Sequence, residues 1–145
     1  MPRLHLYASL LLSLFCAPLL AAAPPKDYGS VRVDEVSSIY DGDTIRVTIR
    51  AWPAVAGERI PVRLYGIDTP EMRDTRPRVY QLARSAKQFS VAQLRGAQRI
   101  ELRKIRRDKY FRLLAEVWVD GRNLSDLLLK AGLAKAYFGG KKVSW

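Results

Sequence analysis

Histidine and cysteine are almost absent from this 145-residue sequence, which contains one of each. Both lie within the first 23 residues. The other 122 residues carry 24 Lys plus Arg against 14 Asp plus Glu, a formal net charge of +10. Without these two residue types, the segment excludes a Ser-His-Asp triad, a thiol nucleophile, a disulfide, an ordinary structural zinc site and an iron–sulfur cluster. Catalysis would have to use carboxylates, Arg, Lys, Tyr or hydroxyls, and a metal would need oxygen ligands, as calcium, magnesium and manganese do.

The length and the charge set further bounds. A chain of this length forms one domain with one core. Its hydrophobic content of 48% argues against global disorder. The strong positive charge favours a polyanionic partner, either a nucleic acid or an anionic membrane surface.

The first 23 residues have the layout of a secretory signal peptide. A short basic start precedes an apolar run over residues 6–20, and the small residues Ala21–Ala23 follow at the expected cleavage region. The apolar run is short for a membrane-spanning helix, although an uncleaved anchor is an alternative. We therefore expect export to the periplasm or the medium. Residues 24–30 would form a loose lead-in, and residues 31–145 one folded domain.

Hydrophobic periodicity predicts the order of the elements. Strict alternation over residues 45–50 and 60–66 predicts two half-buried strands, and further strands are expected from Val31, from Ile100 and from Phe111 to Val119. Helical spacing predicts a helix over residues 79–94 that ends at Gly96, and another from Leu124 to Ala131 that ends at Gly132. The early strands have no helices between them. This order favours a mainly β fold, a small barrel with packed helices, over a parallel α/β sheet.

Several polar residues interrupt or follow the predicted strands and could meet at one rim of such a barrel. Asp43 precedes one strand, Asp68, Thr69 and Glu71 follow another, and Arg63 and Arg112 lie within strands. Carboxylates with a threonine oxygen suit a hard cation, and forked arginines suit a phosphate. A carboxylate outside the cation site, such as Glu71, can orient or deprotonate a water.

Each of these pieces also has a structural interpretation. Residues 41–44, Asp-Gly-Asp-Thr, taken alone form a turn and lack the further acids of an EF-hand. Residues 68–71, Asp-Thr-Pro-Glu, resemble the start of a helix. A single arginine in a strand is usually solvated.

The order of the motifs is more informative than any single motif. The sequence contains Asp41-Gly-Asp-Thr44, Val62-Arg63-Leu64, Gly66-Ile-Asp68-Thr-Pro-Glu71, Asp108-Lys109-Tyr110-Phe111-Arg112-Leu-Leu-Ala115-Glu116, Val119-Asp-Gly-Arg-Asn-Leu124 and Ala131-Gly-Leu-Ala134. Together they resemble the staphylococcal nuclease (thermonuclease) family over roughly residues 30–138. The resemblance implies an OB-fold, a five-stranded Greek-key barrel with packed helices.

The resemblance also implies an activity. It implies calcium-dependent hydrolysis of DNA and RNA phosphodiesters with little sequence preference, leaving 3′-phosphorylated products. Magnesium and manganese are alternative metals, single strands the expected preferred substrate, and a monomer the expected state. By this likeness the metal ligands are Asp43, Asp68 and the carbonyl of Thr69, the general base is Glu71, the phosphate-binding arginines are Arg63 and Arg112, and the nucleotide contacts are Lys109, Tyr110 and Tyr137.

One position departs from the family pattern. The family usually has glycine before the second arginine, where this chain has Phe111. A backbone angle that only glycine adopts readily would displace Arg112. Phe111 is in phase with Leu113, Ala115 and Val117, and we therefore expect ordinary strand geometry.

A basic stretch runs from Arg95 to Arg112, with eight basic residues against Glu101 and Asp108. It is expected to bind a polyanion non-specifically and in a salt-dependent manner, with nearby aromatic rings stacking on bases. A solvated surface is the structural alternative. The main functional alternative to a nuclease is a non-catalytic OB-fold module that binds nucleic acid. An envelope-anchored scaffold is a third.

Overall fold

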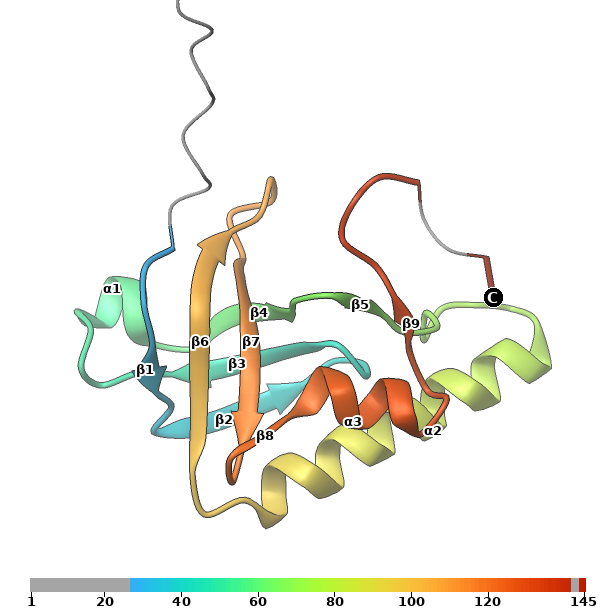
Figure 1. Ribbon diagram of the computed structural model, residues 1–145, viewed down its shortest axis with the longest axis horizontal. Coiled ribbons are helices and arrows are strands. Elements are labelled where there is room, and N and C mark those ends of the chain that lie inside the picture. Colours follow the sequence, from blue (N-terminus) through green and yellow to red (C-terminus); the bar gives the residue numbers. More distant parts are fainter. Residues whose placement is uncertain (1–26, 142–143) are drawn as a thin grey trace, which may run out of the picture.

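The computed structural model describes residues 27–141 and 144–145 (Figure 1). The expected signal peptide and residues 24–26 lie outside the described residues, so export stays a prediction. The elements are β1 (Val31–Arg32), β2 (Glu35–Ile39), β3 (Thr44–Thr48), α1 (Ala54–Gly57), β4 (Ile60–Leu64), β5 (Ile67–Asp68), α2 (Pro77–Gly96), β6 (Ile100–Arg107), β7 (Leu113–Val119), β8 (Arg122–Asn123), α3 (Leu124–Lys130) and β9 (Lys135–Ala136).

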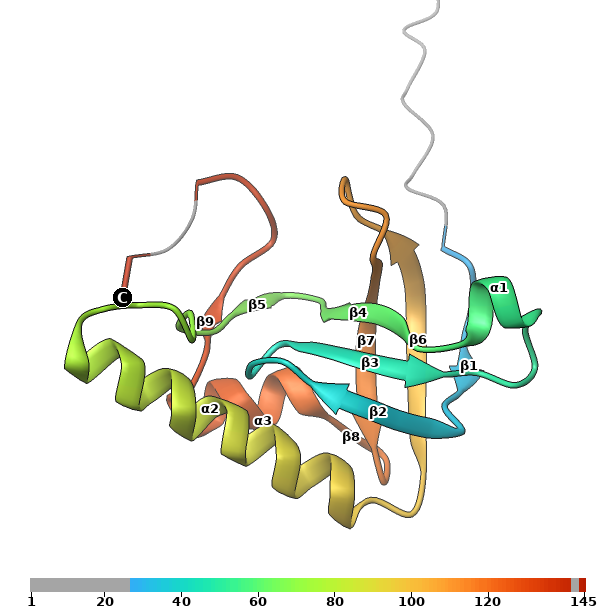
Figure 2. The same ribbon diagram turned by 180° about the vertical axis from the view of Figure 1, so that it is seen from behind.

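The main sheet has the strand order β1-β6-β7-β4-β3-β2, and β8 pairs with β7 outside this order. The strands pair antiparallel except for β4 and β7, which are parallel. Figures 1 and 2 show this sheet curled into a half-barrel, with α2 and α3 side by side at one end. The short strands β5 and β9 pair separately. The arrangement confirms the expected mainly β fold of the OB type with packed helices.

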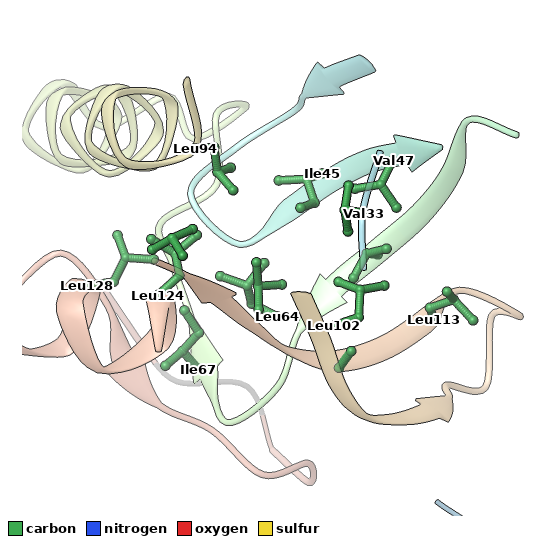
Figure 3. Close-up of a cluster of buried hydrophobic side chains, with 14 of the residues drawn as sticks. Val33, Ile45, Val47, Leu64, Ile67, Leu94, Leu102, Leu113, Leu124 and Leu128 are labelled. Carbon is green, nitrogen blue, oxygen red and sulfur yellow. The ribbon is translucent and has the colours of Figure 1, made fainter. Parts of the chain in front are cut away.

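The core lies inside the curl of the sheet. Along β7, buried and half-buried residues alternate strictly, and Leu113, Ala115, Val117 and Val119 point inward. This is the period of two that the sequence predicted. Figure 3 shows these inward positions meeting side chains from the other strands and from both helices, among them Ile45, Leu64, Leu94, Leu102 and Leu128.

The long helix α2 covers the open end of the half-barrel (Figure 2). It begins with Pro77 at its first turn, where the missing N–H has no helical partner to lose, and it ends at Gly96 as predicted. Its buried side chains recur at helical spacing, from Val79 through Ala83 and Ala86 to Leu94. The helix is therefore fixed against β2 and α3 by one apolar face.

The remaining connections follow local signals. The turn between β7 and β8 has positive φ angles at Asp120 (47°) and Gly121 (79°), the geometry of a tight hairpin. Helix α3 begins where the Asn123 side chain accepts the N–H of Ser125 at 2.9 Å. The described residues contain no helix that is both long and apolar enough to cross a membrane.

Candidate active site

Arg63 lies on β4, opposite Thr44 of β3. Its neighbours Val62 and Leu64 are buried in the core, so the alternation of the strand directs the guanidinium to the other face, as predicted. There it forms ion pairs with two carboxylates, those of Asp43 and Asp68, the latter at 2.9 Å. One arginine thus links a residue before β3 to a residue in β5.

The turn before β3 holds Asp43 in a fully buried position. The Asp43 N–H donates to Asp41 Oδ1 at 3.1 Å, which closes the turn locally. Gly42 allows a close approach to the rest of the fold. A Cβ atom there would lie 2.8 Å from Thr69 Cγ2 and 2.9 Å from Ala86 Cβ. The turn interpretation of residues 41–44 is therefore correct, and the same turn also presents a buried carboxylate.

Asp68 and Thr69 come directly after the β4 turn, where β5 pairs with β9. The Thr69 N–H donates to Asp43 Oδ2 at 2.7 Å. Asp68 accepts from Arg63 through Oδ1 and from the Trp145 indole Nε1, at 3.1 Å, through Oδ2. The interpretation of residues 68–71 as a helix start does not apply, because α2 begins only at Pro77. The chain instead stays extended so that Asp68 and Thr69 face Asp43.

Burial dominates the electrostatics of Asp43. Burial raises the pKa of Asp43 to about 7, and the Asp41 carboxylate also raises it, whereas Arg63 and the Thr69 N–H act in the opposite direction. Arg63 therefore compensates the negative charge only in part. A further positive charge beside Asp43 would stabilise its ionised form.

The oxygens around Asp43 and Asp68 fit a hard cation. Among the described residues, Thr69 Oγ1 is buried and has no hydrogen-bond partner. This oxygen is therefore available to accept a hydrogen bond or to bind a cation. No group of three His, Cys, Asp or Glu side chains arranged for a metal occurs in residues 27–141 and 144–145. The protein donors are thus two carboxylates and the oxygens of Thr69, a set that a calcium or magnesium ion would complete with water.

Arg112 lies in the loop between β6 and β7, and Asp108 fixes it there. Asp108 Oδ1 accepts the N–H groups of Tyr110 at 2.8 Å and Arg112 at 3.0 Å, while Oδ2 accepts Arg112 Nε at 2.8 Å. Asp108 itself was not predicted as a site residue. Its spacing from Tyr110 and Arg112 is the signal that could have identified it, because an aspartate often accepts from backbone N–H groups a few residues further on.

The expectation for Phe111 was wrong. Strand β7 begins at Leu113, and Phe111 has a φ of +62° with 81% of its surface exposed. The alternation with Leu113 is accidental, because the bonds to Asp108 close residues 108–112 into a loop. Arg112 is in the loop rather than in the strand. The left-handed angle nevertheless leaves Arg112 bonded to Asp108 and facing the site.

A hollow of about 410 Å³ brings the predicted residues together. Figure 1 shows the β6–β7 loop and the segment after β9 rising on either side of β4 and β5. Seven of the nine predicted site residues line it, namely Arg63, Asp68, Glu71, Lys109, Tyr110, Arg112 and Tyr137. Asp43 and Thr69 are not part of the lining and lie buried against it, through Arg63 and Asp68. Sequence reasoning missed Asp108, which also lines the hollow, whereas Phe138, another lining residue, is one of the aromatic rings expected near the basic stretch.

The basic stretch spans the end of α2, strand β6 and the loop that follows it. Several of its cations are paired, as Arg103 is with Glu101 at 2.7 Å and Lys104 with Glu116 at 2.7 Å. The Arg103 guanidinium also lies 4.2 Å from the centre of the Trp118 ring. The Trp118 ring therefore contacts a cation of the basic stretch. Phe111 is exposed and does not pack in the barrel.

Comparison with known proteins gives a consistent result. Residues 61–144 match the family model described as staphylococcal nuclease homologue. The chain is 39% identical over 100 residues to the SPbeta prophage-derived endonuclease YokF of Bacillus subtilis. The matched region covers 68% of this chain and 32% of that protein. It is 37% identical over 100 residues to the endonuclease YncB of Bacillus subtilis, a match that covers 68% of this chain and 44% of that protein. It is 33% identical over 105 residues to the thermonuclease of Staphylococcus hyicus, a match that covers 72% of this chain and 59% of that protein. The chain thus spans between about a third and three fifths of the length of these relatives.

Proposed function

Because the chain belongs to the staphylococcal nuclease family, we propose that it is itself a nuclease that hydrolyses the phosphodiester bonds of DNA and RNA with little sequence preference. The observation that carries this proposal is the hollow shared by Arg63, Glu71 and Arg112, with the buried Asp43 carboxylate beside it. A module that only binds nucleic acid has no need for carboxylates among its phosphate-binding arginines.

The two arginines would bind the scissile phosphate. Asp108 binds the Arg112 guanidinium through Nε, in addition to the main-chain N–H, which leaves the two terminal nitrogens for the hollow that Arg112 lines. Arg63 reaches the hollow from β4 and is held in place by Asp43 and Asp68. Hydrolysis builds negative charge on the phosphate oxygens, and fixed guanidinium groups stabilise that charge without reorganising.

Glu71 would act on the attacking water. It is exposed at the wall of the hollow, in the loop that leads from β5 to α2. There its carboxylate orients a water and accepts its proton as the oxygen attacks phosphorus. The proton needs no imidazole, which agrees with a folded segment that lacks histidine.

A divalent cation would complete the site, calcium by family resemblance, with magnesium and manganese as alternatives. Asp43, Asp68 and the Thr69 carbonyl would hold it. When bound, it would supply Lewis-acid stabilisation of charge on the phosphate. Arg63 would then have a second task, because its ion pairs with Asp43 and Asp68 hold the two carboxylates that would bind the cation.

Single-stranded nucleic acid is the substrate that the lining favours. Lys109, Tyr110 and Tyr137 lie around the phosphate-binding arginines, and exposed rings accept unpaired bases by stacking. We also propose that the protein acts as a monomer, is exported by residues 1–23, and leaves 3′-phosphorylated products. The exported form is testable by sequencing the N-terminus of the protein recovered outside the cytoplasm.

Cleavage of single-stranded DNA and RNA tests the proposal, with calcium, with magnesium and with a chelator. We expect degradation that needs a divalent ion and falls about 100-fold or more in Glu71→Gln and in Arg112→Ala. Arg84→Ala is the matched control, since Arg84 lies over Tyr80 on α2 and does not line the hollow, so its activity should be unchanged. Tight, salt-sensitive binding without cleavage in any metal would instead support the binding module.

A further inference from the structure

Phe111 is placed in a way that fold stability does not explain. Its φ of +62° is a conformation that glycine adopts at lower cost, and its ring is 81% exposed. The residue therefore strains the backbone without burying its ring in the core. Its exposed ring suggests a contact outside the fold.

The ring borders a second hollow, of about 130 Å³. Apolar residues of α1, β4 and β7 line it, namely Val55, Ala56, Ile60, Pro61 and Leu113. Val55 is 96% exposed. Phe111 and Arg107 complete the lining, so the hollow combines apolar side chains with one cation.

Arg107 is held beside the Phe111 ring by a hydrogen bond to the main chain of Phe111. Its Nη1 donates to the Phe111 carbonyl at 2.9 Å, and this is the same loop that Asp108 closes. The guanidinium retains further N–H groups, because arginine carries five. It is therefore a positioned cation next to an exposed ring.

One loop consequently serves two hollows. Tyr110 and Arg112 line the active-site hollow, and Phe111, which lies between them in the sequence, lines the second one together with Arg107. Each hollow combines an exposed ring with an arginine. A ring stacks on a base of any sequence, and an arginine binds the adjoining phosphate.

We propose that the hollow of Phe111 and Arg107 is a second base-binding subsite for single-stranded nucleic acid, adjoining the cleavage site across the loop. The proposal rests on the proposed function, which places a strand in the active-site hollow. Phe111 stacks on an unpaired base, and Arg107 binds a phosphate next to it. The subsite lengthens the bound segment and adds no sequence preference.

A lipid surface is the alternative partner for exposed apolar residues next to a cation. The nucleic acid is favoured because the segment of residues 107–112 contributes both to this hollow and to the active-site hollow that Tyr110 and Arg112 line. In addition, α1 has only four residues, whereas insertion at a membrane interface typically uses a longer amphipathic helix.

The dependence of affinity on oligonucleotide length tests the subsite. The full chain carrying Glu71→Gln is titrated with fluorescent oligothymidylates of about two and about eight nucleotides, since OB-folds cover on the order of 4–16 nucleotides. Phe111→Ala is expected to weaken binding of the longer strand roughly tenfold and to leave the dinucleotide unaffected. Phe111→Gly gives the same result with relaxed backbone strain, which separates loss of the ring from misfolding.

Tyr80→Ala is the matched control, because Tyr80 is an exposed ring on α2 that lines neither hollow. Equal affinities of the Glu71→Gln parent and of both Phe111 variants in that background for the longer strand would overturn the subsite, even if the wild type cleaves. Loss of binding to vesicles of phosphatidylglycerol and phosphatidylcholine in the Phe111 variants, with unchanged oligonucleotide affinity, would also overturn it and would assign the hollow to lipid. Failure of the Glu71→Gln parent to bind either oligonucleotide would count against the proposed function first.

Discussion

The indole Nε1 of Trp145 donates a hydrogen bond to Asp68 Oδ2 at 3.1 Å. The two residues are 77 positions apart in the sequence. Trp145 is held in place by Arg76, which donates to its main-chain oxygen at 2.7 Å, and by Lys135, whose Nζ lies 4.6 Å from the ring centre. Its contact orients a carboxylate that we propose as a cation ligand, as groups that bond to metal ligands commonly do.

Replacing Trp145 by phenylalanine tests this orientation. The ring stays but the N–H is lost, so calcium affinity should fall by about tenfold, in the range usual for such outer contacts. Calorimetric titration with calcium alone measures it. Trp118→Phe is the control, since Trp118 bonds to Glu116 on the outer face of the sheet. A gain in calcium affinity would mean that the indole competes with the cation.

The raised pKa of Asp43, to about 7, predicts an unusual dependence of stability on pH. Between the ordinary pKa of an aspartate, 3.8, and about 7, the folded state binds more protons at this group than the unfolded state does. Through Asp43, the free energy of unfolding in a chelator should therefore fall as pH rises across this window. Calcium should bind more tightly as pH rises, because binding requires the ionised carboxylate.

Thermal unfolding at pH 5.5 and pH 8, with chelator and with calcium, measures both effects. Stabilisation by calcium should be clearly larger at the higher pH. Asp43→Asn should remove most of this difference, because the amide does not titrate. An equal shift of the melting temperature by calcium at both pH values would contradict the assignment of Asp43 as a ligand.

Phe111→Gly should stabilise the fold. A non-glycine residue in the left-handed region destabilises the folded state by about 1–2 kcal/mol. The added freedom of glycine stabilises the unfolded chain by about 0.5–1 kcal/mol, which offsets part of that gain. A net gain of about 0.5–1 kcal/mol in the free energy of unfolding is expected, measured by denaturant titration. Phe111→Ala keeps the strained angle and should give no such gain. Equal effects of the two substitutions would show that the angle is not the cause.

Asp108→Ala should impair catalysis more than stability. Without its acceptors, the N–H groups of Tyr110 and Arg112 and the Arg112 side chain lose their fixed positions. A misplaced phosphate-binding group can cost about 100-fold in rate, so kcat should fall by about 10- to 100-fold with a smaller change in KM. Asp108→Asn keeps one acceptor oxygen and should recover part of kcat. Full activity of the alanine variant would show that Arg112 is held by other contacts.

Much of the site could be predicted because local sequence patterns determine where several of its side chains lie. The alternation around Arg63 set the direction of its side chain, and the Asp-Gly-Asp-Thr pattern predicted the turn at Asp43. The ordered motifs then identified seven residues that line one hollow. The Phe111 prediction failed for a matching reason. Alternation predicts a strand only where a neighbouring strand continues beside it. Here β6 ends at Arg107, and the Asp108 side chain binds the next residues into a loop, so Phe111 has no strand to pair with.

The sequence by itself determined the main strands, the helices α2 and α3 and the identity of the residues able to carry oxygen-ligand and phosphate chemistry, because those depend on residue type and short-range period. It did not predict the four-residue helix α1 or the short strands β5, β8 and β9. Only the tertiary structure decided how these residues meet. Thr69 reaches Asp43 because Gly42 permits close approach, and Trp145 reaches Asp68 because β5 pairs with β9. Burial of Asp43, and with it the pKa of its carboxyl, depends on chain segments far apart in sequence closing over it, which no local pattern encodes.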